Sequence, residues 1–203
     1  MNGLDWTGQL AAQLTWHWTA QARPRLDGLT DAEYFFEPVA GCWNVRVAGS
    51  AGVAPHYGSG PMRIEFESDP PDPAPVTTIA WRLGHLIVGV FGDRNARYFG
   101  GPPMDYLSYA YPATAEGALA ALDDGYDRWI AGVNALSADE LAVNCREPGF
   151  ESESMAALVL HIHREAIHHL AEIALLRDLW AHGLRRPGRP GAVDGAPGRT
   201  IAQ

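Results

Sequence analysis

The hydrophobic and polar positions of this chain recur mainly at the three-to-four-residue spacing of helices. Residues 5–22 place Leu14 and Trp18 on one apolar face, which predicts a first helix that buries this face. The helix is expected to end before Arg23-Pro24, because a proline ring disfavours the helical conformation of the residue before it. The period-two alternation that marks strands is scarce. We therefore predict an all-α fold.

Three more helices are predicted, each beginning after a serine or threonine whose hydroxyl can cap the first turn. The second helix is apolar almost all round and is therefore expected to be central. The expected bounds are Thr77 or Thr78 to about Phe99, Thr114 to about Leu136, and Ser152 or Ser154 to Gly183.

The segment from Leu29 to Pro75, between the first two helices, is rich in glycine, proline and short polar clusters. It predicts a brief helical turn at Asp31–Phe36 and leaves room for a short hairpin around Met62–Phe66. Because so long a connection is uncommon in a compact domain, we expect it to be functional or to lie over a site.

The chain has 203 residues, of which 47% are apolar, and this is enough for the core of one domain. After Leu184 the sequence RRPGRPGAVDGAPGRTIAQ offers nothing to bury. We predict a folded domain over residues 1–184 and a disordered tail over residues 185–203.

A formal net charge of −9 at pH 7 disfavours binding to nucleic acid or to an anionic membrane.

The N-terminal residues do not form a signal peptide, and the most apolar stretch, residues 79–91, is interrupted by polar residues and glycines. Cys42 and Cys145 lie far apart in the sequence and outside any CxxC motif, which suits a reducing compartment. We expect a cytoplasmic protein with neither nucleic acid nor membrane as a partner.

The run HIHREAIHHL of the last predicted helix carries four histidines within nine residues. On a helical wheel of about 100° per residue, Glu165 and His169 fall within the apolar stripe and should point inward. His163 falls on the more polar arc and is expected to be solvated, whereas His161 and His168 lie at the margins. A buried carboxylate beside a buried imidazole needs a partner or a metal ion, because uncompensated burial of charge is costly.

His85, in the apolar second helix, is the expected partner of this pair. Gly89 and Gly92 share its face and are predicted to leave open space above its ring. Two nitrogens and one oxygen from facing helices form a tripod that zinc accepts with one position open, which makes His85, Glu165 and His169 the predicted ligands. The alternatives are a hydrogen-bonded core histidine at position 85 and an ordinary ion pair between the other two.

Four residues are candidates for the surroundings of the metal: Glu172, His168, Trp81 and Gly89. Glu172 either orients a ligand imidazole or accepts a proton from an incoming ligand, or it pairs with a nearby arginine. His168 is expected at the helix margin or as a donor to a ligand, and tryptophans such as Trp81 more often belong to a core. The zinc-protease motif HEXXH is absent, so no catalytic residue is assigned.

The segments TIAWRLGHL and HIHREAIHHLAEIALLRDLW resemble the DinB-like superfamily over about residues 5–182. The superfamily includes the metal-binding domain of mycothiol-dependent maleylpyruvate isomerase, and EPVAGCWNVR resembles its actinobacterial members. The resemblance implies a metal-binding four-helix bundle with a long loop between helices one and two. In the mycothiol-dependent branch the ligands are His, Glu and His, and these match His85, Glu165 and His169.

The isomerase carries an additional C-terminal domain, whereas this chain continues into a Pro/Gly/Arg-rich segment, so isomerase activity is not expected. The resemblance instead implies a metal- and thiol-dependent transferase, with zinc, or else nickel, activating a low-molecular-weight thiol towards an electrophilic substrate. All fifteen basic residues are arginine, which is typical of a GC-rich genome and makes mycothiol the expected thiol. A metal-dependent hydrolase and a non-catalytic metal-binding stress-response protein are the alternatives. A homodimer is compatible with each of these three functions.

Overall fold

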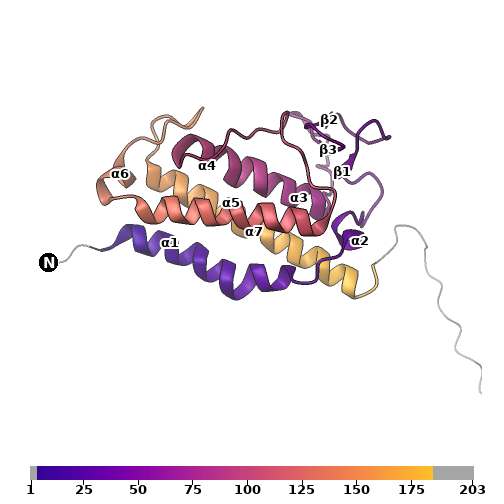
Figure 1. The fold of residues 1–203 in the computed structure, drawn as a ribbon, viewed down its shortest axis with the longest axis horizontal. Helices are drawn as coiled ribbons and strands as arrows, with labels where there is room; N and C mark the ends of the chain where they lie inside the picture. The colour runs from indigo at the N-terminus through magenta and orange to yellow at the C-terminus, as the bar shows by residue number, and fades with distance from the viewer. Residues whose placement is uncertain (1–3, 185–203) are drawn as a thin grey trace, which may run out of the picture.

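The computed structural model describes residues 4–184. Long helical segments run side by side along the long axis of the molecule, and their mutual contacts enclose the core (Figure 1). The predicted tail at 185–203 lies outside the described residues. The helical elements are α1 (Trp6–His17) with η1 (Trp18–Ala22) and η2 (Arg23–Leu26), α2 (Asp31–Tyr34), α3 (Ile79–His85) with η3 (Leu86–Gly92) and α4 (Asp93–Tyr98), α5 (Ala115–Ala135), α6 (Ala138–Ala142), and α7 (Met155–Ala181).

Hydroxyl caps determine where α3, α5 and α7 begin. Thr78 accepts from the backbone N–H of Trp81 at 3.2 Å, and Thr114 and Ser154 cap their helices in the same way. These contacts satisfy amide groups that a first helical turn leaves without a partner. The predicted starts of these three helices are therefore confirmed.

Two helical details differ from the prediction. The first helical segment does not end before Pro24 but continues as a 3₁₀ turn to Leu26. Pro24 lies in the first positions of that turn, where its missing N–H costs no hydrogen bond. The short helix α6 was not predicted, although Ser137 and Glu140 form a capping box at its start.

The all-α prediction is wrong for one segment, because the connection between η2 and α3 contains a three-stranded antiparallel sheet. Its strands are β1 (Val45–Val47), β2 (His56–Tyr57) and β3 (Met62–Glu65), in the order β1-β3-β2. The sheet lies beside α3 (Figure 1). Strands of two to four residues are too short to show a period in the sequence.

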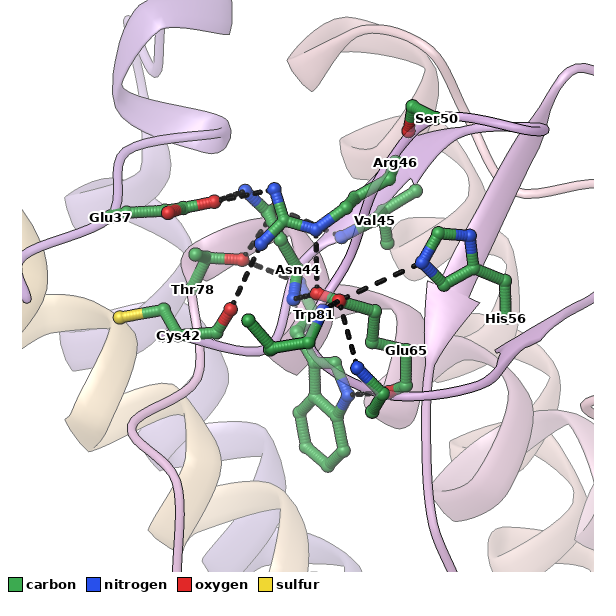
Figure 2. A network of polar contacts seen from close by, with 12 residues as sticks. Glu37, Cys42, Asn44, Val45, Arg46, Ser50, His56, Glu65, Thr78 and Trp81 are labelled. Atoms are coloured by element: carbon green, nitrogen blue, oxygen red, sulfur yellow. Dashed lines mark hydrogen bonds and ion pairs between the residues drawn. The ribbon is translucent and has the colours of Figure 1, made fainter. Parts of the chain in front are cut away.

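A buried carboxylate holds this sheet together (Figure 2). Glu65, at the end of β3, is completely buried, and its Oε2 accepts from the backbone N–H of Asn44 and from Nε of Arg46, each at 2.8 Å. Its Oε1 accepts from the N–H groups of Val53 at 2.6 Å and Ala54 at 3.4 Å. One side chain therefore joins β3, the start of β1 and the loop that leads to β2.

Among residues 4–184, no helix is both long and apolar enough to cross a lipid bilayer.

We predict that Glu65→Gln destabilises the protein by about 3 kcal/mol, at the low end for breaking a buried ion pair because Arg46 keeps Glu37 as a partner at 2.7 Å. For a chain of this size the melting temperature should fall by roughly 6–12 °C. Glu67→Gln, two residues further on and exposed, is the matched control and should melt like the native protein. Equal melting temperatures for both variants would show that Glu65 does not hold the sheet.

Candidate metal centre

The structure brings together the three residues predicted as ligands. His85 is the last residue of α3, and Glu165 and His169 lie on successive turns of α7. One potential ligand atom from each residue lies within 4.8 Å of the other two. The α7 pair therefore lies next to His85, as the prediction of a shared site requires.

His169 presents its Nε2 atom to this centre, because its other ring nitrogen is engaged. Nδ1–H donates to Oε2 of Glu172 at 2.9 Å, and since a carboxylate only accepts, the ring proton is on Nδ1. Nε2 lies 3.8 Å from Oε2 of Glu165. Burial is the main cause that lowers the pKa of His169 to about 3, and repulsion of its charged form by Arg82 and by a protonated His85 adds to it. At neutral pH the imidazole is therefore uncharged and its Nε2 lone pair is available.

His85 is also held through its Nδ1 atom, in this case by the hydroxyl group of Tyr106. Its Nδ1 lies 2.5 Å from the hydroxyl oxygen of Tyr106, its ring stacks on Trp81 with centroids 5.4 Å apart, and its centroid lies 4.7 Å from that of His169. When Nδ1 carries the proton and donates to Tyr106, Nε2 is free to bind a metal. Burial lowers the pKa of His85 to about 4, so this ring is also uncharged at neutral pH.

The open space predicted above His85 is not present. Tyr106, from the connection between α4 and α5, lies so close to Gly89 that a Cβ atom there would clash with its hydroxyl. Met104 occupies the corresponding space at Gly92. The two glycines therefore admit side chains from this connection instead of leaving a channel to the ring. The sequence does not reveal which segment covers a helix face, so Tyr106 could not have been identified.

Both readings of Glu172 apply at once. Its Oε2 accepts from Nδ1–H of His169 and from Arg82, a residue of α3 that the sequence had not singled out. Glu172 therefore orients a candidate ligand and pairs with an arginine. His168 lies at the margin as predicted, with 61% of its side chain exposed and its Nε2 3.5 Å from Oε1 of Glu172.

Glu165 is less buried than its position on the wheel indicated, because a wheel gives direction and not depth. Its side chain is 31% exposed. Oε1 lies 3.6 Å from Nη2 of Arg164 and 3.7 Å from Nδ1 of His161, so its charge is compensated without a metal. The centre is closed by Tyr106 on the His85 side and opens on the Glu165 side.

The prediction that His163 is solvated is wrong. Its residue is only 4% exposed, and its ring lies edge-on to Trp129 of α5, with centroids 6.1 Å apart. Helix α7 contacts α1, α3, η3 and α6, so it is covered on several sides and its polar arc is partly buried. Burial lowers the pKa of His163 to about 4.

The end of β3 supports both aromatic neighbours of His85. The backbone carbonyl of Glu65 accepts from Nε1–H of Trp81 at 2.6 Å (Figure 2). The next residue, Phe66, stacks on Tyr106 with ring centroids 5.5 Å apart. This sheet, whose strand β3 falls where a short hairpin around Met62–Phe66 was left open, is therefore the support of one candidate ligand.

The donor set fits a divalent metal ion. It offers two neutral imidazole nitrogens and one carboxylate oxygen, the combination that zinc takes in open sites. Tetrahedral ligands at about 2.1 Å from zinc lie roughly 3.4 Å apart, slightly closer than the 3.8 Å between His169 and Glu165. A second group also brings its potential ligand atoms within 4.8 Å of one another: His168, His169 and Glu172. It is more exposed, and Glu172 is already bound by Arg82.

Comparison with known proteins gives the family. The sequence model of the DinB superfamily matches residues 13–173, which is most of the chain, and the chain therefore belongs to the DinB superfamily. No curated protein and no solved structure matches it. The superfamily is metal-binding, and this agrees with the candidate ligands in the structure. The actinobacterial assignment stays a prediction.

We predict that the purified protein contains about one divalent metal ion per chain and that Glu165→Ala and His169→Ala lose it, because two protein ligands hold an ion poorly. Elemental analysis measures the metal content. His168→Ala should keep the ion, since it belongs only to the second group, and exposed His182→Ala is the control. Loss of metal in His168→Ala with retention in Glu165→Ala would assign the ion to the second group.

We also predict that Gly89→Ala weakens metal binding while the protein stays folded, because the added Cβ displaces the Tyr106 hydroxyl from Nδ1 of His85. Loss of such an outer partner typically costs 10–100-fold in metal affinity. Competition with a chromogenic chelator measures the affinity, and Tyr106→Phe should show a similar loss.

Gly132→Ala, at a comparably tight helical position on α5, is the matched control because its Cβ would meet the ring of Phe99 and no candidate ligand. An unchanged affinity in Gly89→Ala would mean that Tyr106 does not orient His85.

Proposed function

We propose that this DinB-superfamily protein is a metal-dependent transferase in which a low-molecular-weight thiol attacks an electrophilic substrate. The observation that supports the proposal is the tripod of His85, Glu165 and His169, whose ligand atoms lie within 4.8 Å of one another. A tripod with one accessible side suits catalysis better than a purely structural metal, which proteins usually enclose with four ligands. We expect zinc, with nickel as the alternative.

The residues of this chain would hold the ion through Nε2 of the two histidines and a carboxylate oxygen of Glu165. When bound, such an ion supplies Lewis acidity that lowers the pKa of a thiol coordinated to it. Glu172 keeps His169 in the tautomer that leaves Nε2 free, and Tyr106 can accept from Nδ1–H of His85 so that its Nε2 is free as well. Because Glu172 already accepts from Arg82 and His169, it is better suited to orienting a ligand than to taking up the thiol proton.

The accessible side of the tripod indicates how reactants approach. Tyr106 covers His85, whereas Glu165 is partly exposed beside His161 and Arg164. The thiol and its electrophile would therefore enter along the start of α7. The same donors would also serve hydrolysis, with water in place of the thiol, or a non-catalytic metal-binding role, and these remain the alternatives.

The proposal also includes a four-helix bundle, a cytoplasmic location and a homodimer. The contacts among α1, α5, α7 and the α3–η3 segment support a four-helix bundle of DinB type. Both cysteines are free and buried, which is compatible with a reducing cytoplasm where low-molecular-weight thiols are abundant. A homodimer is the assembly that we would test first.

We predict that the cobalt-substituted protein develops sulfur-to-metal charge-transfer absorption with one small thiol, because thiolate is a softer ligand than water. Mycothiol, bacillithiol and glutathione should be titrated separately, and mycothiol is the expected partner. Glu165→Ala should abolish the response, whereas His182→Ala should retain it. The absence of a response to all three thiols would contradict the transferase proposal and favour hydrolysis or metal binding alone.

A further inference from the structure

A cavity of about 310 Å³ lies beside the candidate metal centre. This is the lower end of the volume range of small-molecule sites, roughly 300–1,000 Å³, and it corresponds to about ten water molecules. Its walls come from α4, from the segment between α6 and α7, and from the first three turns of α7.

The rim of this cavity contacts one candidate ligand, and its back wall contacts the helical turn that follows another. At the rim, His161 and Arg164 approach Oε1 of Glu165 at 3.7 and 3.6 Å. At the back, Arg94 donates to the backbone carbonyl of Gly89, one helical turn after His85. A molecule in the cavity would therefore lie next to the accessible side of the tripod.

The polar groups of the cavity offer more donors than acceptors. Glu147 is occupied, because it accepts from Arg94 and, at 2.9 Å, from the hydroxyl of Tyr98. Nε of Arg94 is buried and has no hydrogen-bond partner among the described residues. Arg164 contributes a guanidinium that is 70% exposed and, within residues 4–184, bonds only to Nδ1 of His161 and forms an ion pair only with Glu165. A ligand that brings oxygen acceptors would match these groups.

The rest of the lining is mainly apolar. Leu158 and Cys145 are buried, and the phenyl ring of Phe150 is exposed at the cavity. Ala157, with its small side chain, faces the cavity from α7. A ligand made only of polar groups would leave these walls without complementary contacts, so the occupant also needs a carbon body.

We propose that this cavity binds the electrophilic substrate and that the substrate is a small molecule with an apolar body and a carboxylate held by Arg164. This inference rests on the proposed transferase function, but binding does not require that any thiol reacts. Glu153 is the one lining carboxylate that no described residue neutralises through a hydrogen bond or ion pair, and its exposure to solvent screens its charge. Replacing it with glutamine should therefore strengthen the binding of a carboxylate only slightly.

The test uses the full-length, metal-loaded protein and 3-phenylpropanoate, an unreactive probe with an apolar body and one carboxylate. Calorimetry should detect binding of this probe and at least tenfold weaker binding of 3-phenylpropan-1-ol and of acetate, which lack the charge and the apolar body. Arg164→Gln should weaken binding of the probe about tenfold, the loss expected for one charge-assisted hydrogen bond.

Two further variants test the location. Ala157→Trp should abolish binding by filling the cavity, whereas Arg128→Gln, an arginine that lines a separate cavity on α5, should leave binding unchanged. Because the tryptophan could disturb folding, Phe150→Ala at the exposed wall provides a milder change and should weaken binding. Equal affinity in Arg164→Gln, Ala157→Trp and the native protein would overturn the proposal.

A carboxylate can also bind the metal directly, and the metal-free protein separates this case. We expect the probe to bind the metal-free protein with similar affinity and to leave the visible spectrum of the cobalt form unchanged. If the probe binds only when the metal is present and changes the visible spectrum of the cobalt form, it binds the metal and not the cavity, and the proposal is overturned. Failure of the proposed function is a separate result, because it is measured by the thiol response of the cobalt protein.

Discussion

The negative charge of Glu65, completely removed from water, is the constraint on which much of the site depends. A buried carboxylate is stable only if each oxygen is well hydrogen-bonded, and here the donors come from Asn44, Arg46 and the loop at Val53. These donors tie the strands together, and Thr78, at the start of α3, donates its hydroxyl to Oδ1 of Asn44 at 2.8 Å. The sheet in turn fixes Trp81, the ring on which His85 stacks, so that a charge distant from the tripod contributes to its geometry.

The two imidazoles of the tripod are held by different chemical means. His169 is oriented by a carboxylate, which determines its tautomer, and that carboxylate is itself held by Arg82. His85 is oriented by aromatic rings and a phenol. Both arrangements can leave Nε2 directed at the centre, and burial keeps the rings uncharged near pH 7, as their lowered pKa values indicate. The third group, Glu165, stays near solvent and gives the centre its accessible side.

The parts of this structure that the sequence predicted are those encoded locally. Caps at Thr78, Thr114 and Ser154 and the apolar stripe of α7 gave the helices and the candidate ligands, since both patterns act within a few residues. The parts that were missed depend on contacts between distant segments. Tyr106 reaches His85 from another connection, and His163 is buried because a neighbouring helix covers it. A helical wheel contains neither piece of information.

One feature of the ligand helix has a geometric consequence for the whole site. Immediately after His85 the helix widens into the π-helical segment η3, Leu86–Gly92, before it returns to α-helix. Such segments arise from one additional residue in a helix, and each residue shifts the phase of all that follow by about 100°. His85 and Arg94 are therefore brought to one side of the molecule by an inserted residue, and a single deletion within η3 would turn Arg94 away while His85 stayed in place.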